Sequence, residues 1–145
     1  MGDISKDIQG TFPNIKVKAL LNIIYTANWI HSIQNSFFKP YRISSQQYNI
    51  LRILRGAGTA ITMQTIKDRM LERAPNATRL MDKLCLKNYV QRIPCSSDRR
   101  VVHIEIKEEG QVLLKMIDNT LKDDILKNLT KKEASVLSDL LDKIR

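Results

Sequence analysis

Hydrophobic side chains recur at intervals of three and four residues over most of this chain, which predicts a mainly helical protein. In the first such segment, residues 15–37, the apolar positions are too numerous to share one narrow stripe. This pattern is typical of a helix that is buried on two sides. Lys39 precedes Pro40, and the residue before a proline avoids the helical conformation. We therefore expect the helix to end at this point.

Two shorter helices are predicted from their N-terminal capping residues. Ser44 and Gln47 have the spacing of a capping box, so a helix begins at Ser44, and Gly56-Ala57-Gly58 ends it. Thr62 is a suitable N-cap for another helix of about two turns.

A fourth helix is predicted from Pro75 to Lys87. Proline suits the first helical position because the N–H that it lacks would have no partner there. Asn88 tolerates the left-handed conformation that closes a helix. The apolar positions of this helix have spacings of 0, 3, 4 and 7 and predict one buried side, formed by Ala77, Leu80, Met81 and Leu84.

Residues 89–95 and 101–106 predict the two strands of a hairpin, and the second of them alternates in polarity. Turn-forming residues lie between them at 96–98. Pro94 cannot donate a hydrogen bond to a neighbouring strand, so its strand should lie at the edge of the sheet.

Two amphipathic helices are predicted in the C-terminal part of the chain, at residues 108–128 and 131–144. Thr130 and Glu133 form a second capping box ahead of the last helix. The order helix, short helix, helix and hairpin predicts a winged helix-turn-helix at residues 44–106. The fold class is therefore mainly α with a small two- or three-stranded β-wing.

The distribution of charge along the chain indicates what kind of partner this core binds. The chain has 145 residues and a net charge of +9. Residues 1–66 and 67–107 each carry +5, whereas residues 108–145 carry −1. A polyanionic partner is expected at the basic part. The basic part includes the whole predicted winged core.

Other classes of protein are less compatible with the composition. No segment approaches the roughly 18 uninterrupted apolar residues of a membrane span, so we expect a soluble protein. Cys85 and Cys95, with two isolated histidines, form neither a disulfide framework nor a zinc site, which fits a reducing cytoplasm. Glycine-rich phosphate loops and nucleophile motifs are absent from the sequence, so we expect no enzyme, cofactor or metal.

The helix predicted at residues 75–87 and the hairpin turn hold the candidate DNA-binding residues. Arginine and asparagine can read base edges by paired hydrogen bonds, and lysine attracts phosphate. On a helical projection, one set of side chains lies opposite the buried side or flanks that region: Pro75, Asn76, Thr78, Arg79, Asp82 and Lys83. The turn adds a second set at the tip of the wing, Asp98, Arg99 and Arg100, where arginine would suit a narrow minor groove. The alternative is that these are solvated surface residues in weak ion pairs.

Four motifs give the chain a resemblance to the MarR family of transcriptional regulators. They are PNATRLMDKL at 75–84, NYVQR at 88–92, DRR at 98–100 and EEG at 108–110. The resemblance covers nearly the whole chain and implies one MarR-type domain, residues 1–145. It also implies a homodimer with two recognition helices in successive major grooves and wing arginines at the adjacent minor groove. Asp98 and Arg100 match the paired wing positions.

The predicted dimer also has support that is independent of the family. The all-round apolar first helix and the C-terminal helices offer more apolar surface than a small winged core can cover, so the protomer should pair. We expect residues 15–38 and 108–145 to form the dimer interface. A two-fold dimer predicts a pseudo-palindromic DNA operator.

The resemblance also implies that some members of the family bind small aromatic or phenolic effectors. The candidates for such contacts here are Tyr25, Trp29 and Tyr48, although aromatic residues on buried helices are more often core. The resulting hypothesis is a sequence-specific regulator of double-stranded DNA, most often a repressor, that an effector releases. The alternatives are an architectural DNA binder without sequence preference and a protein-interaction module that uses the winged fold.

Overall fold

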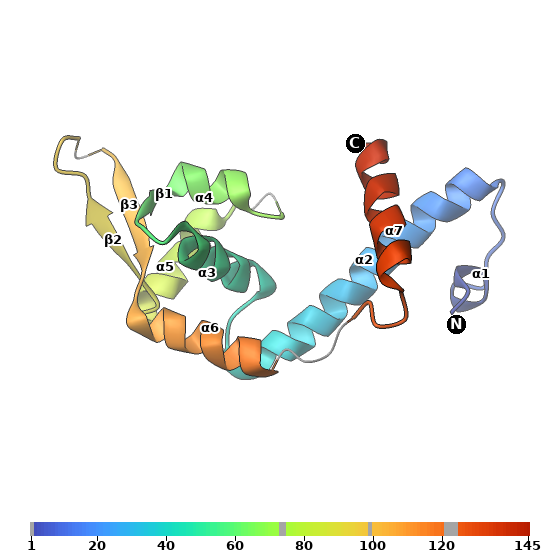
Figure 1. The fold of residues 1–145 in the computed structure, drawn as a ribbon, viewed down its shortest axis with the longest axis horizontal. Helices are drawn as coiled ribbons and strands as arrows, with labels where there is room; N and C mark the ends of the chain where they lie inside the picture. The colour runs from blue at the N-terminus through green and yellow to red at the C-terminus, as the bar shows by residue number, and fades with distance from the viewer. Residues whose placement is uncertain (1, 73–74, 99, 121–124) are drawn as a thin grey trace. The chain divides into compact units, whose positions relative to one another are not determined.

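The computed structural model describes residues 2–72, 75–98, 100–120 and 125–145 (Figure 1). The chain divides into two compact units, residues 1–48 and residues 49–145. Each unit is described by itself.

The first unit is built around the long helix α2, Ile15–Phe38. The short helix α1, Ile4–Asp7, precedes it, and the 3₁₀ helix η1, Lys39–Tyr41, follows it. The extent of α2 confirms the helix predicted from the sequence. Its predicted burial on two sides is not found within a single chain, because most apolar side chains of α2 are exposed. The exposed set comprises Ile15, Leu20, Leu21, Ile23, Ile24, Tyr25 and Trp29.

Capping side chains define where the helices of the winged core begin. Before helix α3, Ser45–Ala57, the Gln47 N–H donates to Ser44 Oγ at 3.1 Å, and the Ser44 N–H donates to Gln47 Oε1 at 3.0 Å. Before helix α4, Met63–Arg69, the Thr65 N–H donates to Thr62 Oγ1 at 3.2 Å. Both predicted caps are confirmed.

Helix α5, Ala77–Leu86, begins later than the sequence predicted. Its first backbone hydrogen bond runs from the Leu80 N–H to the Asn76 carbonyl at 3.0 Å, so Asn76 is the N-cap. The prediction that Pro75 occupies the first helical position is therefore wrong, since Pro75 lies in the turn before the helix. The predicted end is confirmed, because Asn88 adopts a left-handed conformation with φ of 62°.

The wing is a three-stranded antiparallel sheet in the order β1-β3-β2. Its strands are β1, Ile61–Thr62, β2, Val90–Pro94, and β3, Val102–Ile106. Pro94 pairs with Val102, and β2 is an edge strand, as predicted. No sequence pattern predicted β1, although the predicted fold class allowed a third strand.

The core of the second unit lies between α3, α4, α5, the sheet and helix α6, Glu108–Thr120. It contains the predicted buried side of α5, and the wing projects beyond these helices as a hairpin (Figure 1). The fully buried larger side chains of this unit are Ile50, Leu51, Leu54, Ile66, Met81, Leu84, Ile104, Leu114 and Ile117. This packing holds α5 at the surface with its other side exposed.

The C-terminal helices follow the prediction only in part. Helix α6 ends at Thr120, and residues 125–128 form turns, so the predicted continuation of the helix to residue 128 is wrong. The leucine predicted to extend this helix at 121 lies outside the described residues. Helix α7, Lys131–Ile144, has the predicted capping box of Thr130 and Glu133.

Candidate nucleic-acid interface

The outward side of α5 carries the predicted DNA-reading residues. Ala77, Leu80, Met81 and Leu84 are buried, and the side chains between them are therefore turned outward. The exposed set from the prediction comprises Pro75, Asn76, Thr78, Arg79, Asp82 and Lys83, with Pro75 and Asn76 just before the helix. The structure thus brings all six predicted residues onto or next to one exposed helix.

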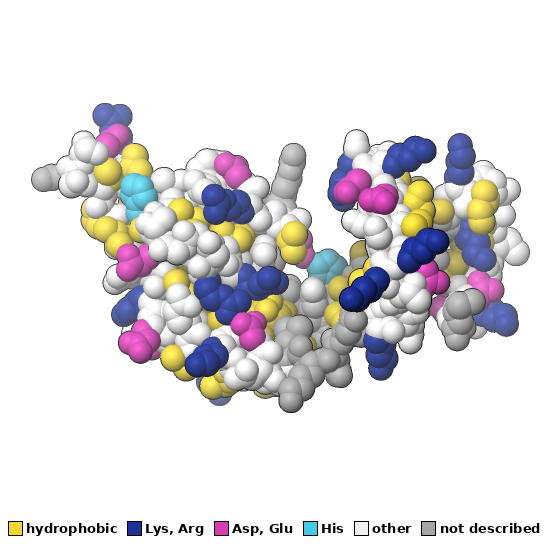
Figure 2. Space-filling model, viewed as in Figure 1, with side chains coloured by type: hydrophobic (Ala, Val, Ile, Leu, Met, Phe, Trp, Pro, Cys, Tyr) yellow, Lys and Arg dark blue, Asp and Glu magenta, His cyan; other side chains and the backbone are white. Residues whose placement is uncertain are grey.

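The turn of the wing presents a second cationic position. The Arg100 N–H donates to Asp98 Oδ1 at 2.9 Å, and Arg100 Nε lies 3.8 Å from the same oxygen. The Arg100 side chain is 95% exposed. Figure 2 shows Lys or Arg side chains at the tip of the hairpin. Arg99, which was also predicted to contact DNA, lies outside the described residues. Asp98 thus shapes the turn from which Arg100 extends into solvent.

An ion pair connects α5 with the wing. Arg92 on β2 donates from Nη2 to Asp82 Oδ1 at 2.5 Å. The hydrogen bond to Asp82 raises the pKa of Arg92. The prediction from sequence placed Asp82 on the outward side of α5 but assigned no role to Arg92. Arg92 lies two residues after Val90 on β2, so both side chains leave the strand on the same face. This spacing is the one sequence signal that could have placed Arg92 on the face of the sheet that packs against α5.

The candidate effector residues lie in the first unit and are not adjacent there. Tyr25 and Trp29 are one turn apart on α2 and exposed. Tyr48 packs on Phe38, with 4.7 Å between the ring centroids. Phe38 lies nine residues beyond Trp29, or about 14 Å along the helix. Within this unit, Tyr48 is therefore distant from the other two.

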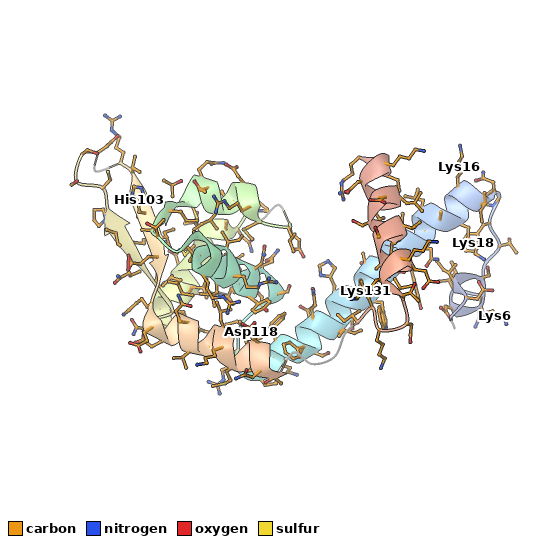
Figure 3. All side chains as sticks on the ribbon, in the orientation of Figure 1. Lys6, Lys16, Lys18, His103, Asp118 and Lys131 are labelled. Carbon is orange, nitrogen blue, oxygen red and sulfur yellow. The ribbon has the colours of Figure 1, made fainter. Side chains whose placement is uncertain are left out.

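A groove lies between α3 and α6 in the second unit. It has a volume of about 350 Å³, and its lining residues are Arg55, Glu108, Gln111, Val112, Lys115 and Asp118. Arg55 Nη1 donates to Asp118 Oδ2 at 2.6 Å. Asp118 is labelled on α6 in Figure 3. Sequence analysis did not identify this ion pair, because the partners are far apart along the chain.

Cys85 and Cys95 are free thiols and half-buried. The Sγ atom of Cys95 lies 3.1 Å from Ser97 Oγ, and this hydrogen bond is the main reason that the pKa of Cys95 is lowered. Within the described parts of the chain, no three His, Cys, Asp or Glu side chains are placed to hold a metal ion. Nor does any described helix have the length and apolar character to cross a membrane.

A comparison with family models matches residues 43–102 to the MarR family. The multiple antibiotic resistance protein MarR of Salmonella typhimurium is 29% identical over 114 residues, which cover 76% of this chain and 78% of the relative. The transcriptional regulator PecS of Dickeya dadantii is 26% identical, and the match covers 99% of this chain and 92% of PecS.

Solved structures agree with these matches. A mutant MarR of Escherichia coli, solved in complex with operator DNA, has a TM-score of 0.75 at 25% identity and covers 99% of both chains. A MarR transcription factor of Planctomyces limnophilus has a TM-score of 0.70 at 29% identity and covers 92% of this chain and 98% of the other.

The exposed polar side of α5, the wing and these relatives together define a winged-helix, DNA-binding transcription regulator. The chain is similar to the MarR family, whose model matches its winged core at residues 43–102. Of these relatives, PecS is a transcriptional regulator and the Planctomyces limnophilus protein a transcription factor.

Proposed function

We propose that this protein is a homodimeric, sequence-specific repressor that binds a pseudo-palindromic operator in double-stranded DNA. Residues 44–106 form the DNA-binding part, and residues 15–38 and 108–145 form the dimer interface. The observation that carries this proposal is the joint exposure of Arg79 on α5 and Arg100 on the wing, within one compact unit.

The two arginines have different roles in the proposed complex. Helix α5 enters the major groove, where Asn76 and Arg79 read base edges and Thr78 and Lys83 contact the backbone. Arg100 reaches the adjacent minor groove, whose negative potential attracts its guanidinium. Asp98 holds the turn in the shape that extends Arg100.

The exposed apolar side chains of α2 and α7 support the dimer. On α7 they lie at spacings of 0, 1, 4 and 8, which is one side of a helix: Val136, Leu137, Leu140 and Ile144. Contiguous apolar surface of this kind marks a protein interface. The partner in the proposed interface is a second copy of the chain, and two-fold symmetry then requires two similar DNA half-sites about one helical turn apart.

The proposal also includes a small-molecule effector. A small aromatic or phenolic molecule would contact Tyr25 and Trp29 or, at a separate place, Tyr48. Its binding would change the populations of dimers with different spacings of the two recognition helices. Repression follows if the bound dimer blocks RNA polymerase.

Selection of duplexes from a random pool tests the proposal directly. We expect the recovered sequences to contain two inverted half-sites and to bind far more tightly than shuffled duplexes of the same composition. Equal binding of both kinds would indicate an architectural DNA binder instead. Absence of any duplex binding, together with capture of an acidic protein without DNA, would indicate a protein-interaction module.

Repression itself requires a separate measurement. Transcription in vitro from a promoter that contains the selected duplex should fall when the protein is added. An increase in transcription would show an activator.

A further inference from the structure

We propose that Arg92 is a positioning residue for DNA recognition: it binds the Asp82 carboxylate and thereby keeps that carboxylate away from Arg79 and from the DNA. This inference rests on the proposed role of Arg79 in reading bases. Arg92 itself need not touch DNA in this scheme, since it acts through Asp82.

The position of Asp82 creates the need for such a partner. Asp82 lies on the same exposed side of α5 as Arg79, three residues further along the helix. Side chains three residues apart on a helix are neighbours and can pair. A carboxylate at this position would draw the Arg79 guanidinium away from base edges. It would also repel the phosphates on either side of the groove that α5 enters.

The wing supplies the partner through the register of its strands. Arg92 pairs with Ile104 across β2 and β3, so both side chains leave the sheet on the same face. Ile104 is buried, and this face packs against the helices of the core. From there the Arg92 guanidinium reaches the edge of α5 and meets Asp82 at 2.5 Å.

The contact is partly exposed and adds little to the stability of the fold. The side chains of Arg92 and Asp82 are 42% and 50% exposed. Ion pairs in such positions contribute little to folding because water screens them. When DNA covers α5, water is excluded and an unpaired carboxylate becomes far more unfavourable. The pair therefore matters mainly in the DNA complex.

The second unit contains a matched control for this pair. Arg55 and Asp118 also form a single arginine–carboxylate pair, at 2.6 Å, with side chains 34% and 43% exposed. It joins α3 to α6 and includes no residue of α5 or the wing hairpin. Arg55→Gln removes the same charge as Arg92→Gln and breaks a similar contact.

The experiment compares full-length Arg92→Gln, Asp82→Asn, the double variant and Arg55→Gln. The probes are the duplex selected from the random pool and a shuffled duplex. Arg92→Gln should lower the ratio of the two affinities by about tenfold, the effect expected when one bidentate base contact is lost. Adding Asp82→Asn should restore the ratio to within about threefold of the unmodified protein. Arg55→Gln should leave the ratio unchanged, and Arg92→Gln and Arg55→Gln should show similar urea denaturation midpoints.

Each other outcome overturns the inference. If Arg92 contacts phosphate directly, Arg92→Gln weakens both duplexes equally, lowers the salt dependence and is not rescued by Asp82→Asn. If the pair is only structural, Arg92→Gln lowers the denaturation midpoint and the double variant stays impaired. If the unmodified protein does not distinguish the two duplexes, both the proposed function and this inference fail.

Discussion

Arg79 and Arg100 belong to the same compact unit but stand in different surroundings. Arg79 is held on a helix whose other side is packed into the core, so its direction is fixed by the helix. Arg100 extends from a turn and is almost entirely in solvent. A side chain with a fixed direction suits base reading, whereas a mobile cation suits attraction to phosphates and to the minor groove.

Substitution of each arginine should therefore have a different effect on DNA binding. Arg79→Ala should reduce discrimination between the selected and the shuffled duplex by roughly 1–3 kcal/mol. Arg100→Ala should weaken both duplexes similarly and reduce the slope of affinity against salt concentration by about one. Competition binding over a salt series measures both quantities. Equal behaviour of the two variants would contradict the proposed division of roles.

Gly110 illustrates a residue whose identity is set by close packing. A Cβ at this position would overlap the Tyr89 carbonyl oxygen and lie 2.8 Å from Ile106 Cγ1. The same carbonyl accepts the Lys107 N–H at 2.9 Å, so it cannot move away without loss of that bond. Helix α6 can approach the start of β2 this closely only because residue 110 has no side chain.

Gly110→Ala should destabilise the protein by about 1–3 kcal/mol because of this overlap. Gly56→Ala is the matched control, since a Cβ at position 56, in α3, meets nothing within 4 Å. It should leave the stability unchanged or raise it by up to about 1 kcal/mol, as helix propensity predicts. Urea denaturation at one fixed protein concentration measures both. If Gly110→Ala leaves the free energy of unfolding unchanged, the backbone at Tyr89 can shift without loss of stability.

Among the elements, those with local signals were predicted best. The capping pairs Ser44–Gln47 and Thr130–Glu133 join residues three apart, so their hydrogen bonds depend only on nearby sequence. The left-handed Asn88 and the edge position of Pro94 are likewise consequences of single residues. These features depend on nearby residues and not on any tertiary contact.

Elements that depend on distant contacts were missed or misplaced. Strand β1 has two residues, too few for a pattern of alternation, and exists because Ile61 and Thr62 pair with Ile104 and His103 of β3. The residues at 125–128 have the apolar spacing of a helix but form turns. Periodicity alone does not distinguish these outcomes.

The cap of α4 provides a test at the scale of an element. Thr62→Ala removes the hydroxyl that accepts the Thr65 N–H and should destabilise the fold by about 1 kcal/mol. Thr62→Ser keeps the hydroxyl and should have a much smaller effect. Urea denaturation of both variants gives the comparison. Equal losses would mean that the methyl group of Thr62, rather than its hydroxyl, stabilises this corner.

For the whole molecule, the apolar side chains that a single chain leaves exposed are the main evidence for pairing. They occur on α2 and on α7, at opposite ends of the sequence. The helix predicted to be buried on two sides is instead largely exposed in one chain, and this difference is explained if a second copy covers it.

A charge placed in this surface should separate the proposed dimer. Leu140 lies on α7 with 55% of its surface exposed. Leu140→Glu should shift the protein to monomers and reduce binding of the selected duplex, because both half-sites can no longer be bound at once. Sedimentation velocity measures the change in mass. The control is Leu86→Glu, because Leu86 is 87% exposed on α5, outside the proposed interface, and should leave the mass unchanged.

Local sequence was sufficient to predict the helices α2 to α7 apart from the start of α5 and the end of α6. It also predicted the caps of α3, α4 and α7, the wing turn and the exposed basic side of α5. These depend on periodicity, on capping side chains and on charge, all of which act over a few residues. Tertiary structure alone revealed β1, the contact of Gly110 with Tyr89 and the binding of Asp82 by Arg92. These depend on which surfaces meet when the chain folds, and no short-range pattern specifies that.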